Sequence, residues 1–373
     1  MKNNDNDDVA WMKRALWLAR KGEGETCQHP MVGAVIVKHG HKVSEGWFRR
    51  PGEPHAEVHA LREGGANVRG STIYLNLEPC SHYGQTPPCA DALVRAGIKR
   101  VVAGMMDPNP LVSGRGFAML RDGGVKVDTG VLEKECQDLN RVFTKYITTK
   151  RPYVILKAAA TLDGNIATKT GNSLYITGEE ARKEVHRLRD IYQAVMVGAG
   201  TVKADNPQLT VRRQGGKNRH PRPVVLSSKL DFPLKSNFMS AGGEDGPLIF
   251  TSKVAGVKKI KSFRQAGAEV EIIKKDRSGG LDLKEIMKQL GERQIASVLL
   301  EGGGGLFSSF LRANMADEVV MFFAPRMLAG DGIPLTRGTG PRKMEDALLL
   351  DDLSSRRLGE DIMITGRVIN GRH

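Results

Sequence analysis

Four residues in the first quarter of the chain have the side chains of a hydrolytic zinc site. His55 and Glu57 stand two positions apart, and Cys80 and Cys89 follow in a proline-containing stretch. A catalytic zinc site takes three protein ligands and keeps the fourth position open for water. We therefore predict that His55, Cys80 and Cys89 bind Zn²⁺ and that Glu57, left without a ligand role, carries protons.

This residue set indicates a particular reaction. Zinc lowers the pKa of a bound water to about 7, which provides a hydroxide nucleophile at neutral pH. Zinc-dependent nucleobase deaminases combine an H-x-E motif with P-C and a second cysteine, and their Glu is an acid/base. Glu57 would pass the proton of the water to a ring nitrogen and to departing ammonia. Taken singly, His55 is more typical of a surface histidine, and each cysteine is more typical of a small buried thiol. Only their order favours a deaminase.

Composition limits the other possibilities. A chain of 373 residues suggests two domains. The net charge of +14 implies anionic partners, and because it is dispersed and aromatics make up only 5% of the chain, we favour phosphorylated small molecules over nucleic acid. Four cysteines, two of them assigned to zinc, fit a reducing cytoplasm. The chain shows neither an apolar run of the ~20 residues that span a membrane nor a secretory signal.

Strands and helices alternate in the first half, which predicts a layered α/β domain. A boundary at Lys150-Arg151-Pro152 divides the chain into domains 1–150 and 151–373. In the first domain we expect strands at 32–37, 42–48, 71–77, 99–106 and 125–128 and helices at 9–20, 55–63, 90–96, 116–121 and 132–145.

The second half also alternates strands and helices, and it contains no internal sequence repeat. A capping box at 177–180 predicts a helix that runs to Tyr192. We further expect strands at 153–160, 194–198, 222–227, 248–251, 296–300, 319–324 and 361–369 and helices at 281–292 and 305–313. The glycine run 302–305 fits either a phosphate cradle or a close-packed turn, and it is not a Rossmann fingerprint.

The whole chain resembles the bifunctional deaminase/reductase family of riboflavin biosynthesis. The first half carries GEPHAEVHA at 52–60, LEPCSHYGQTPPC at 77–89 and DPNP at 107–110. The usual deaminase signature separates its cysteines by two residues, and the eight that intervene here are the spacing of this family. The second half carries LKAAATLDG at 156–164, GTVKADNP at 200–207 and EGG at 301–303.

The resemblance implies a cytidine-deaminase-like three-layer α/β/α domain followed by a dihydrofolate-reductase-like α/β domain. The first would deaminate 2,5-diamino-6-(5-phosphoribosylamino)pyrimidin-4(3H)-one with Zn²⁺. The second would use NADPH to reduce the ribosyl group to ribityl, with hydride going to C1 of the opened sugar. The family also implies a cytoplasmic homo-oligomer.

The resemblance also implies roles for individual residues. The positions expected to contact NADPH are Ala160, Tyr175, Thr201, Asp205, Ser228, Gly303, Gly304, Gly305, Leu306, Phe307, Ser308 and Ser309. Those expected to contact substrate are Lys157, Ser173, Arg189, Leu209, Arg212, Glu301 and His29, with the arginines pairing with its phosphate. Two residues depart from the family pattern, since His29 replaces the usual Asn and Tyr175 replaces a frequent Trp. Taken alone, charges such as Asp205 and Arg212 are more typical of solvated or capping residues.

Three other interpretations remain open at this point. A zinc-dependent nucleic-acid (tRNA) deaminase would use the same zinc residues and the positive charge, but it leaves the second half unexplained. A reductase whose zinc half has decayed conflicts with the complete zinc set. A non-enzymatic binding module does not account for residues that generate a nucleophile.

Overall fold

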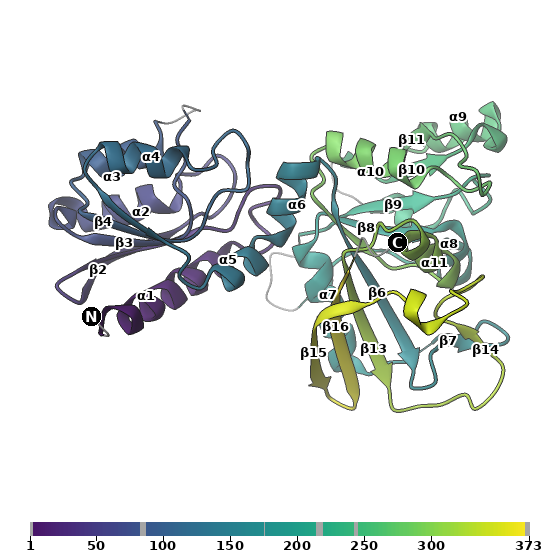
Figure 1. The fold of residues 1–373 in the computed structure, drawn as a ribbon. Helices are drawn as coiled ribbons and strands as arrows, with labels where there is room; N and C mark the ends of the chain where they lie inside the picture. The colour runs from purple at the N-terminus through teal and green to yellow at the C-terminus, as the bar shows by residue number, and fades with distance from the viewer. Residues whose placement is uncertain (1–2, 83–86, 175, 214–218, 242–244, 370–373) are drawn as a thin grey trace. The chain divides into compact units, whose positions relative to one another are not determined.

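The computed structural model describes residues 3–82, 87–174, 176–213, 219–241 and 245–369 (Figure 1). The chain forms two compact units, residues 1–150 and 151–373. Each unit is built on its own sheet and has its own hydrophobic core. Among the described residues, no helix has the length and apolarity to cross a membrane.

A five-stranded sheet organises the first unit, in the order β2-β1-β3-β4-β5. Strand β1 is antiparallel to its neighbours β2 and β3, whereas β3, β4 and β5 run parallel. The strands are β1 (Gly33–Lys38), β2 (His41–Trp47), β3 (Thr72–Leu77), β4 (Arg100–Met105) and β5 (Lys126–Thr129). All five strands expected from the sequence of this half are therefore present.

Helices cover both faces of this sheet because its strands are apolar on both sides. Along β1, Ala34 and Ile36 join one core cluster, while Val35 and Val37 join another on the opposite face. The first cluster lies under α2 (Ala56–Gly64), α3 (Cys89–Arg95) and α4 (Arg115–Asp122). The second lies under α1 (Asn3–Ala19), α5 (Glu133–Leu139) and α6 (Arg141–Thr149). This confirms the three-layer α/β/α fold.

The single helix expected at 132–145 is wrong, because Asn140 divides it into α5 and α6. Asn140 is buried, and its side chain binds the main chain of a distant loop. Its Oδ1 accepts a hydrogen bond from Met31 N at 2.8 Å, and its Nδ2 donates to Met31 O at 3.1 Å. Asn76 Nδ2 donates to the same carbonyl at 2.9 Å. Two buried amides thus fix the loop that carries His29.

The second unit contains a nine-stranded sheet in the order β11-β10-β9-β8-β12-β6-β13-β16-β15. The strands from β11 to β13 are parallel, and β16 and β15 add an antiparallel edge. The members are β6 (Tyr153–Thr161), β8 (Ala194–Gly198), β9 (Arg222–Leu226), β10 (Leu248–Thr251), β11 (Glu269–Ile272), β12 (Ser297–Leu300), β13 (Glu318–Ala324), β15 (Leu350–Leu358) and β16 (Asp361–Val368). A separate pair joins β7 (Asn165–Thr168) to β14 (Gly332–Pro334).

The helices of the second unit are α7 (Glu179–Ile191), α8 (Ala199–Asp205), α9 (Val257–Gln265), α10 (Leu283–Glu292) and α11 (Gly304–Arg312). The capping box expected at the start of α7 is wrong, since Gly178 is the N-cap residue and no side chain of that motif caps the helix. Instead, the buried Asp361 accepts a hydrogen bond from Gly178 N through Oδ2 at 2.7 Å. The cap therefore comes from a strand that is far away in sequence.

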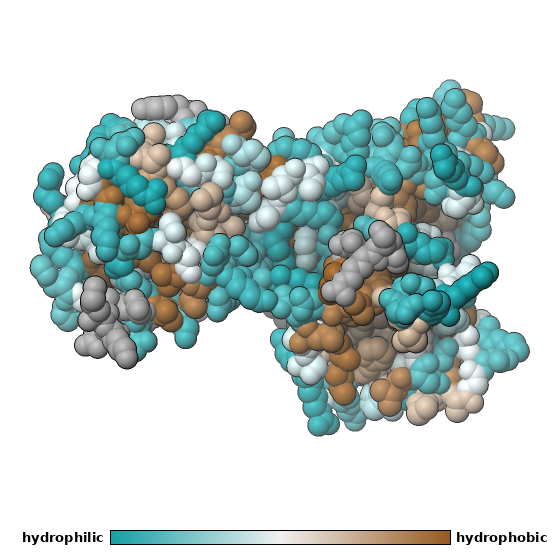
Figure 2. Space-filling model, in the orientation of Figure 1, coloured by the Kyte–Doolittle hydropathy of each residue, from teal (hydrophilic) through white to brown (hydrophobic). Residues whose placement is uncertain are grey.

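Six elements of this unit were not predicted from the sequence: β7, β11, β14, β15, α8 and α9. Strand β15 shows why, because most of its residues are exposed and it carries no alternating apolar pattern. Apolar surface gathers over β15 and β16 (Figure 2), where Leu353 and Ile362 are exposed.

Candidate active sites

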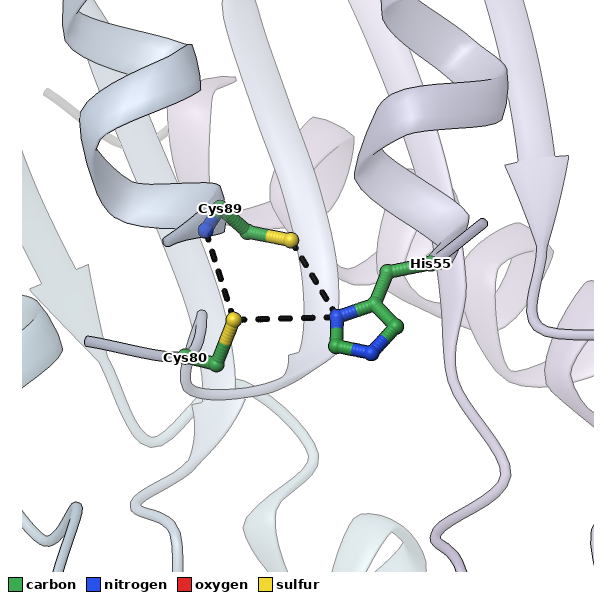
Figure 3. Close-up of side chains that lie close together, drawn as sticks. All are labelled: His55, Cys80 and Cys89. Atoms are coloured by element: carbon green, nitrogen blue, oxygen red, sulfur yellow. Dashed lines mark hydrogen bonds between the residues drawn. The ribbon is translucent and has the colours of Figure 1, made fainter. Parts of the chain in front are cut away.

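Three side chains from separate elements converge in the first unit (Figure 3). His55 immediately precedes α2, Cys80 follows β3, and Cys89 is the first residue of α3. Their ligand atoms all lie within 4.8 Å of one another. His55 Nδ1 is 3.3 Å from Cys89 Sγ and 3.6 Å from Cys80 Sγ. One imidazole and two thiols at this spacing fit Zn²⁺ and leave a coordination position for water.

The protonation of this cluster also suits a cation. The pKa of Cys80 is lowered to about 4, mainly by its hydrogen bond with the Cys89 side chain and also by that with His55. The Cys89 main-chain N–H donates to Cys80 Sγ as well, at 3.3 Å. The hydrogen bond to Cys80 and burial raise the pKa of Cys89. The hydrogen bond to Cys80 raises the pKa of His55 to about 9. The low pKa of Cys80 favours its thiolate, and metal binding would displace protons from its two neighbours.

Glu57 lies beside this cluster in the first turn of α2. It is buried, with 4% of its surface exposed, and it interacts with the Cys89 side chain. Burial raises the pKa of its carboxyl group. A carboxyl group with a raised pKa next to the zinc ligands is suited to take and return a proton.

The structure also brings His29 to this region. Its ring centroid lies 5.9 Å from that of Phe48, whose ring meets His55 edge-on at 5.7 Å. Phe48 is buried, and sequence reasoning missed it, because an aromatic residue at the end of a strand, directly after Trp47, is typical of core packing. Glu78, which belongs to the motif at 77–89, is buried two residues before Cys80.

The second unit contains a cleft of about 740 Å³. It opens where β8 and β12 end, and its walls also include residues of β6, β7, α7, α8, β14 and the start of α11. The predicted cofactor and substrate residues that line it are Lys157, Ser173, Arg189, Thr201, Asp205, Leu209, Glu301, Gly303, Gly304, Gly305 and Leu306.

Other predicted residues lie outside this lining. Tyr175 is outside the described residues. Ala160 is buried in β6, and Phe307 packs in the main core of the unit. The remaining positions that do not line the cleft are Arg212, Ser228, Ser308 and Ser309. The Ser308 hydroxyl is buried, donates to Gly304 O at 2.8 Å and accepts from Arg337 N at 2.7 Å, so it orders the wall of the cleft.

A largely buried charge cluster, whose three side chains are 10–14% exposed, forms one wall of the cleft. Arg189 makes two hydrogen bonds to Glu301, of 2.6 and 2.9 Å, and Lys157 Nζ lies 3.6 Å from Glu301 Oε2. Burial favours the neutral form of Glu301, but Arg189 and Lys157 outweigh it and lower its pKa to about 2. Two cations thus share one carboxylate. Arg182 and Arg337, which sequence reasoning missed, also line the cleft and add positive charge.

The glycine run combines two close-packed positions with two open ones, so it fits the close-packed turn, and the phosphate cradle stays a prediction. A Cβ on Gly304 would lie 2.7 Å from Pro334 O, and one on Gly302 would lie 2.9 Å from the Leu306 side chain, so these two glycines permit close packing. A Cβ on Gly303 or Gly305 would meet no atom within 4 Å. Those two therefore face open space at the start of α11, where main-chain N–H groups favour an anion.

Family models account for both units. Residues 5–105 match the cytidine and deoxycytidylate deaminase zinc-binding region, and residues 152–364 match the RibD C-terminal domain. The zinc-binding match covers His55, Cys80 and Cys89, so the cluster belongs to a zinc-binding deaminase domain. The second match is to a reductase domain of the NADPH-dependent type.

Similar proteins match nearly the whole chain. The riboflavin biosynthesis protein RibD of Aquifex aeolicus is 43% identical, with 96% of this chain and 97% of the relative covered. Acinetobacter baumannii RibD superposes with a TM-score of 0.88 at 35% identity and covers 98% of this chain and 100% of its own. A third similar protein is a diaminohydroxyphosphoribosylaminopyrimidine deaminase/5-amino-6-(5-phosphoribosylamino)uracil reductase of Thermotoga maritima. It superposes with a TM-score of 0.82 at 36% identity, and the match covers 98% of this chain and 100% of the other. The chain therefore belongs to the RibD family of riboflavin-biosynthesis proteins, which combine a deaminase with a reductase.

Proposed function

We propose that the two units catalyse consecutive steps on one phosphorylated pyrimidine. Residues 1–150 would deaminate 2,5-diamino-6-(5-phosphoribosylamino)pyrimidin-4(3H)-one, and residues 151–373 would reduce the ribosyl group of the product to ribityl. The observation that carries this proposal is the pairing of a His-Cys-Cys cluster beside a buried glutamate with a separate cationic cleft. A nucleic-acid deaminase is not favoured, because it leaves the RibD C-terminal domain without a purpose.

In the first unit, His55, Cys80 and Cys89 would hold zinc. The metal, when bound, supplies an activated water. Glu57 would accept a proton from that water and deliver it to the ring nitrogen. It would then take the proton of the newly added hydroxyl group and deliver it to the amino group, which leaves as ammonia, and its raised pKa suits both roles. His29 would contact the substrate from the loop beside Phe48.

In the second unit, the cationic wall would bind the phosphate of the substrate and NADPH would lie against the start of α11. Arg189 presents a planar group that matches phosphate oxygens, and Lys157 adds a second charge. The cofactor, when bound, would supply the hydride for C1; overall, the bond between C1 and the ring oxygen would break and that oxygen would gain a proton. The exposed backbone of Gly303 and Gly305 leaves room for an anionic group of the cofactor.

The test is a two-readout assay of wild type and Glu57→Gln. We expect the variant to lose about 100-fold or more of ammonia release, the usual scale for removing a general base. It should keep its zinc and should still oxidise NADPH when given pre-deaminated substrate. Glu63→Gln, at the exposed end of the same helix, is the matched control. Ammonia release by Glu57→Gln at the wild-type rate would refute the assignment.

We further propose that the protein works as a homo-oligomer in the cytoplasm. The exposed Leu353 and Ile362 on β15 and β16 offer apolar surface for self-association. The four cysteines are all free thiols, which suits a reducing compartment. Light scattering at several concentrations tests the oligomer, with Leu353→Asp as the variant expected to weaken it.

A further inference from the structure

Glu78 is a buried carboxylate held by main-chain amides. Only 3% of its surface is exposed. Its Oε2 accepts hydrogen bonds from Asp107 N at 3.1 Å and Gly114 N at 3.0 Å. Its Oε1 accepts from Gly116 N at 2.9 Å and Phe117 N at 3.3 Å. Among the ion pairs of the described residues, none involves Glu78, so these N–H groups and the first turn of α4 compensate its charge.

These hydrogen bonds join two segments that are adjacent only in the fold. Glu78 stands two residues before Cys80, on the loop that leaves β3 for the zinc cluster. Its four donors belong to residues 107–117, which run from the end of β4 into α4. Hydrogen bonds to a charged group are shorter and stronger than those between neutral groups. The position of Cys80 is thereby coupled to residues 107–117.

Gly116 makes a second contact between the same two segments. A Cβ at this position would lie only 2.1 Å from Pro79 O and 3.1 Å from Glu78 Oε1. The backbone of Gly116 is helical, so it is close packing and not an unusual φ that requires glycine here. Helix α4 therefore lies directly against the residue that precedes Cys80.

We infer that Glu78 is a positioning residue for the deaminase, an inference that rests on the proposed function. Its carboxylate holds the Cys80 loop and residues 107–117 in one arrangement, so that Cys80 stands at the correct distance from His55 and Cys89. Groups that orient metal ligands from outside the coordination shell typically change metal affinity or activity 10–100-fold when they are removed.

The test variant is Glu78→Gln, which keeps the shape but turns an NH₂ group toward N–H donors. Hydrogen exchange of the zinc-free protein should accelerate at Gly114, Gly116 and Phe117 while amides in β1 stay as slow as in wild type. Zinc affinity, measured by competition with a chelator, should fall about 10–100-fold. The deaminase kcat should fall with it, and NADPH oxidation with pre-deaminated substrate should remain within twofold.

Two further variants make the experiment decisive. Asp122→Asn removes a carboxylate from the other end of α4 and should behave as wild type. Gly116→Ala leaves Glu78 intact but separates α4 from Pro79, and it should reproduce the loss of zinc affinity. If Glu78→Gln does not fold, Gly116→Ala decides the question.

Unchanged zinc affinity in Glu78→Gln, or in Gly116→Ala if Glu78→Gln does not fold, would overturn the inference. So would faster exchange spread evenly over residues 1–150, because that reports a general loss of stability. Failure of the proposed function looks different, since wild type itself would then release no ammonia while the local exchange and zinc effects of Glu78→Gln persisted.

Discussion

Glu301 is the carboxylate at the centre of the charge cluster in the cleft of the second unit. It is almost fully buried, yet Arg189 and Lys157 lower its pKa from 4.5 to about 2. At about 1.4 kcal/mol per pH unit, this difference corresponds to about 3 kcal/mol of stabilisation. Because the folded pKa lies below the unfolded one, this contribution is complete above pH 4.5 and disappears as the pH falls toward 2.

Glu301→Gln should therefore destabilise the second unit at pH 7 by about 3 kcal/mol, and the difference from wild type should shrink steadily between pH 4.5 and pH 2. The second unit contains no tryptophan, so its urea unfolding is best followed by circular dichroism or hydrogen exchange. Glu292→Gln, an exposed carboxylate on α10, should leave the free energy of unfolding nearly unchanged. A difference that persisted undiminished at pH 2 would contradict the linkage.

Arg189→Lys tests whether the planar guanidinium is needed in the cleft. Lysine keeps the charge but cannot form two parallel hydrogen bonds to a carboxylate or phosphate. We expect kcat/KM of the reductase to fall about 10-fold, mainly through a higher KM for the phosphorylated substrate. Arg187→Lys, on the same helix and paired with Glu184, is the control. A KM equal to that of wild type would argue against a phosphate contact.

At the residue scale, the sequence was informative where chemistry requires fixed residue types. The spacing of His55, Cys80 and Cys89 predicted a cluster that the structure brings within 4.8 Å. The partners of these residues were harder to predict. Within the described part of the chain, the Glu78 side chain binds only main-chain N–H groups, and Phe48 acts through ring packing, so the residue types alone did not reveal the role of either.

At the scale of elements, Asn140 shows what periodicity cannot reveal. Apolar spacing predicted one helix, and it is correct on either side of this residue. The break arises because a buried amide binds the main chain of Met31, a partner more than 100 residues away. The strands were predicted best where alternation or apolar runs were strong, whereas exposed β15 and short β7 depend on pairing partners.

Asn140→Ala should destabilise the first unit by about 1–3 kcal/mol, because the N–H and C=O of Met31 each lose a buried partner. All three tryptophans, Trp11, Trp17 and Trp47, belong to this unit, so their fluorescence reports its unfolding selectively. The loop carrying His29 should also become less ordered. Asn67→Ala, an exposed amide in the same unit, should have no effect within about 0.5 kcal/mol.

At the scale of the whole molecule, the separate cores predict separable behaviour. The zinc ligands come from three elements of the first unit only, and a metal that binds the folded state stabilises it. Zinc removal by a chelator should abolish ammonia release and lower the melting temperature seen by tryptophan fluorescence. NADPH oxidation with pre-deaminated substrate should stay within twofold of the untreated protein. A parallel loss of both activities would show that the units depend on each other.

The excess of positive charge in the reductase cleft also has a kinetic consequence. The two carboxylates of the lining, Glu301 and Asp205, neutralise only part of the charge of its four cations, Lys157, Arg182, Arg189 and Arg337. Such a field attracts anions over distances comparable to the Debye length, which is about 8 Å at physiological ionic strength. Added salt should therefore slow the capture of the phosphorylated intermediate more than it slows hydride transfer. With both steps running, the delay between ammonia release and NADPH oxidation should lengthen as ionic strength rises.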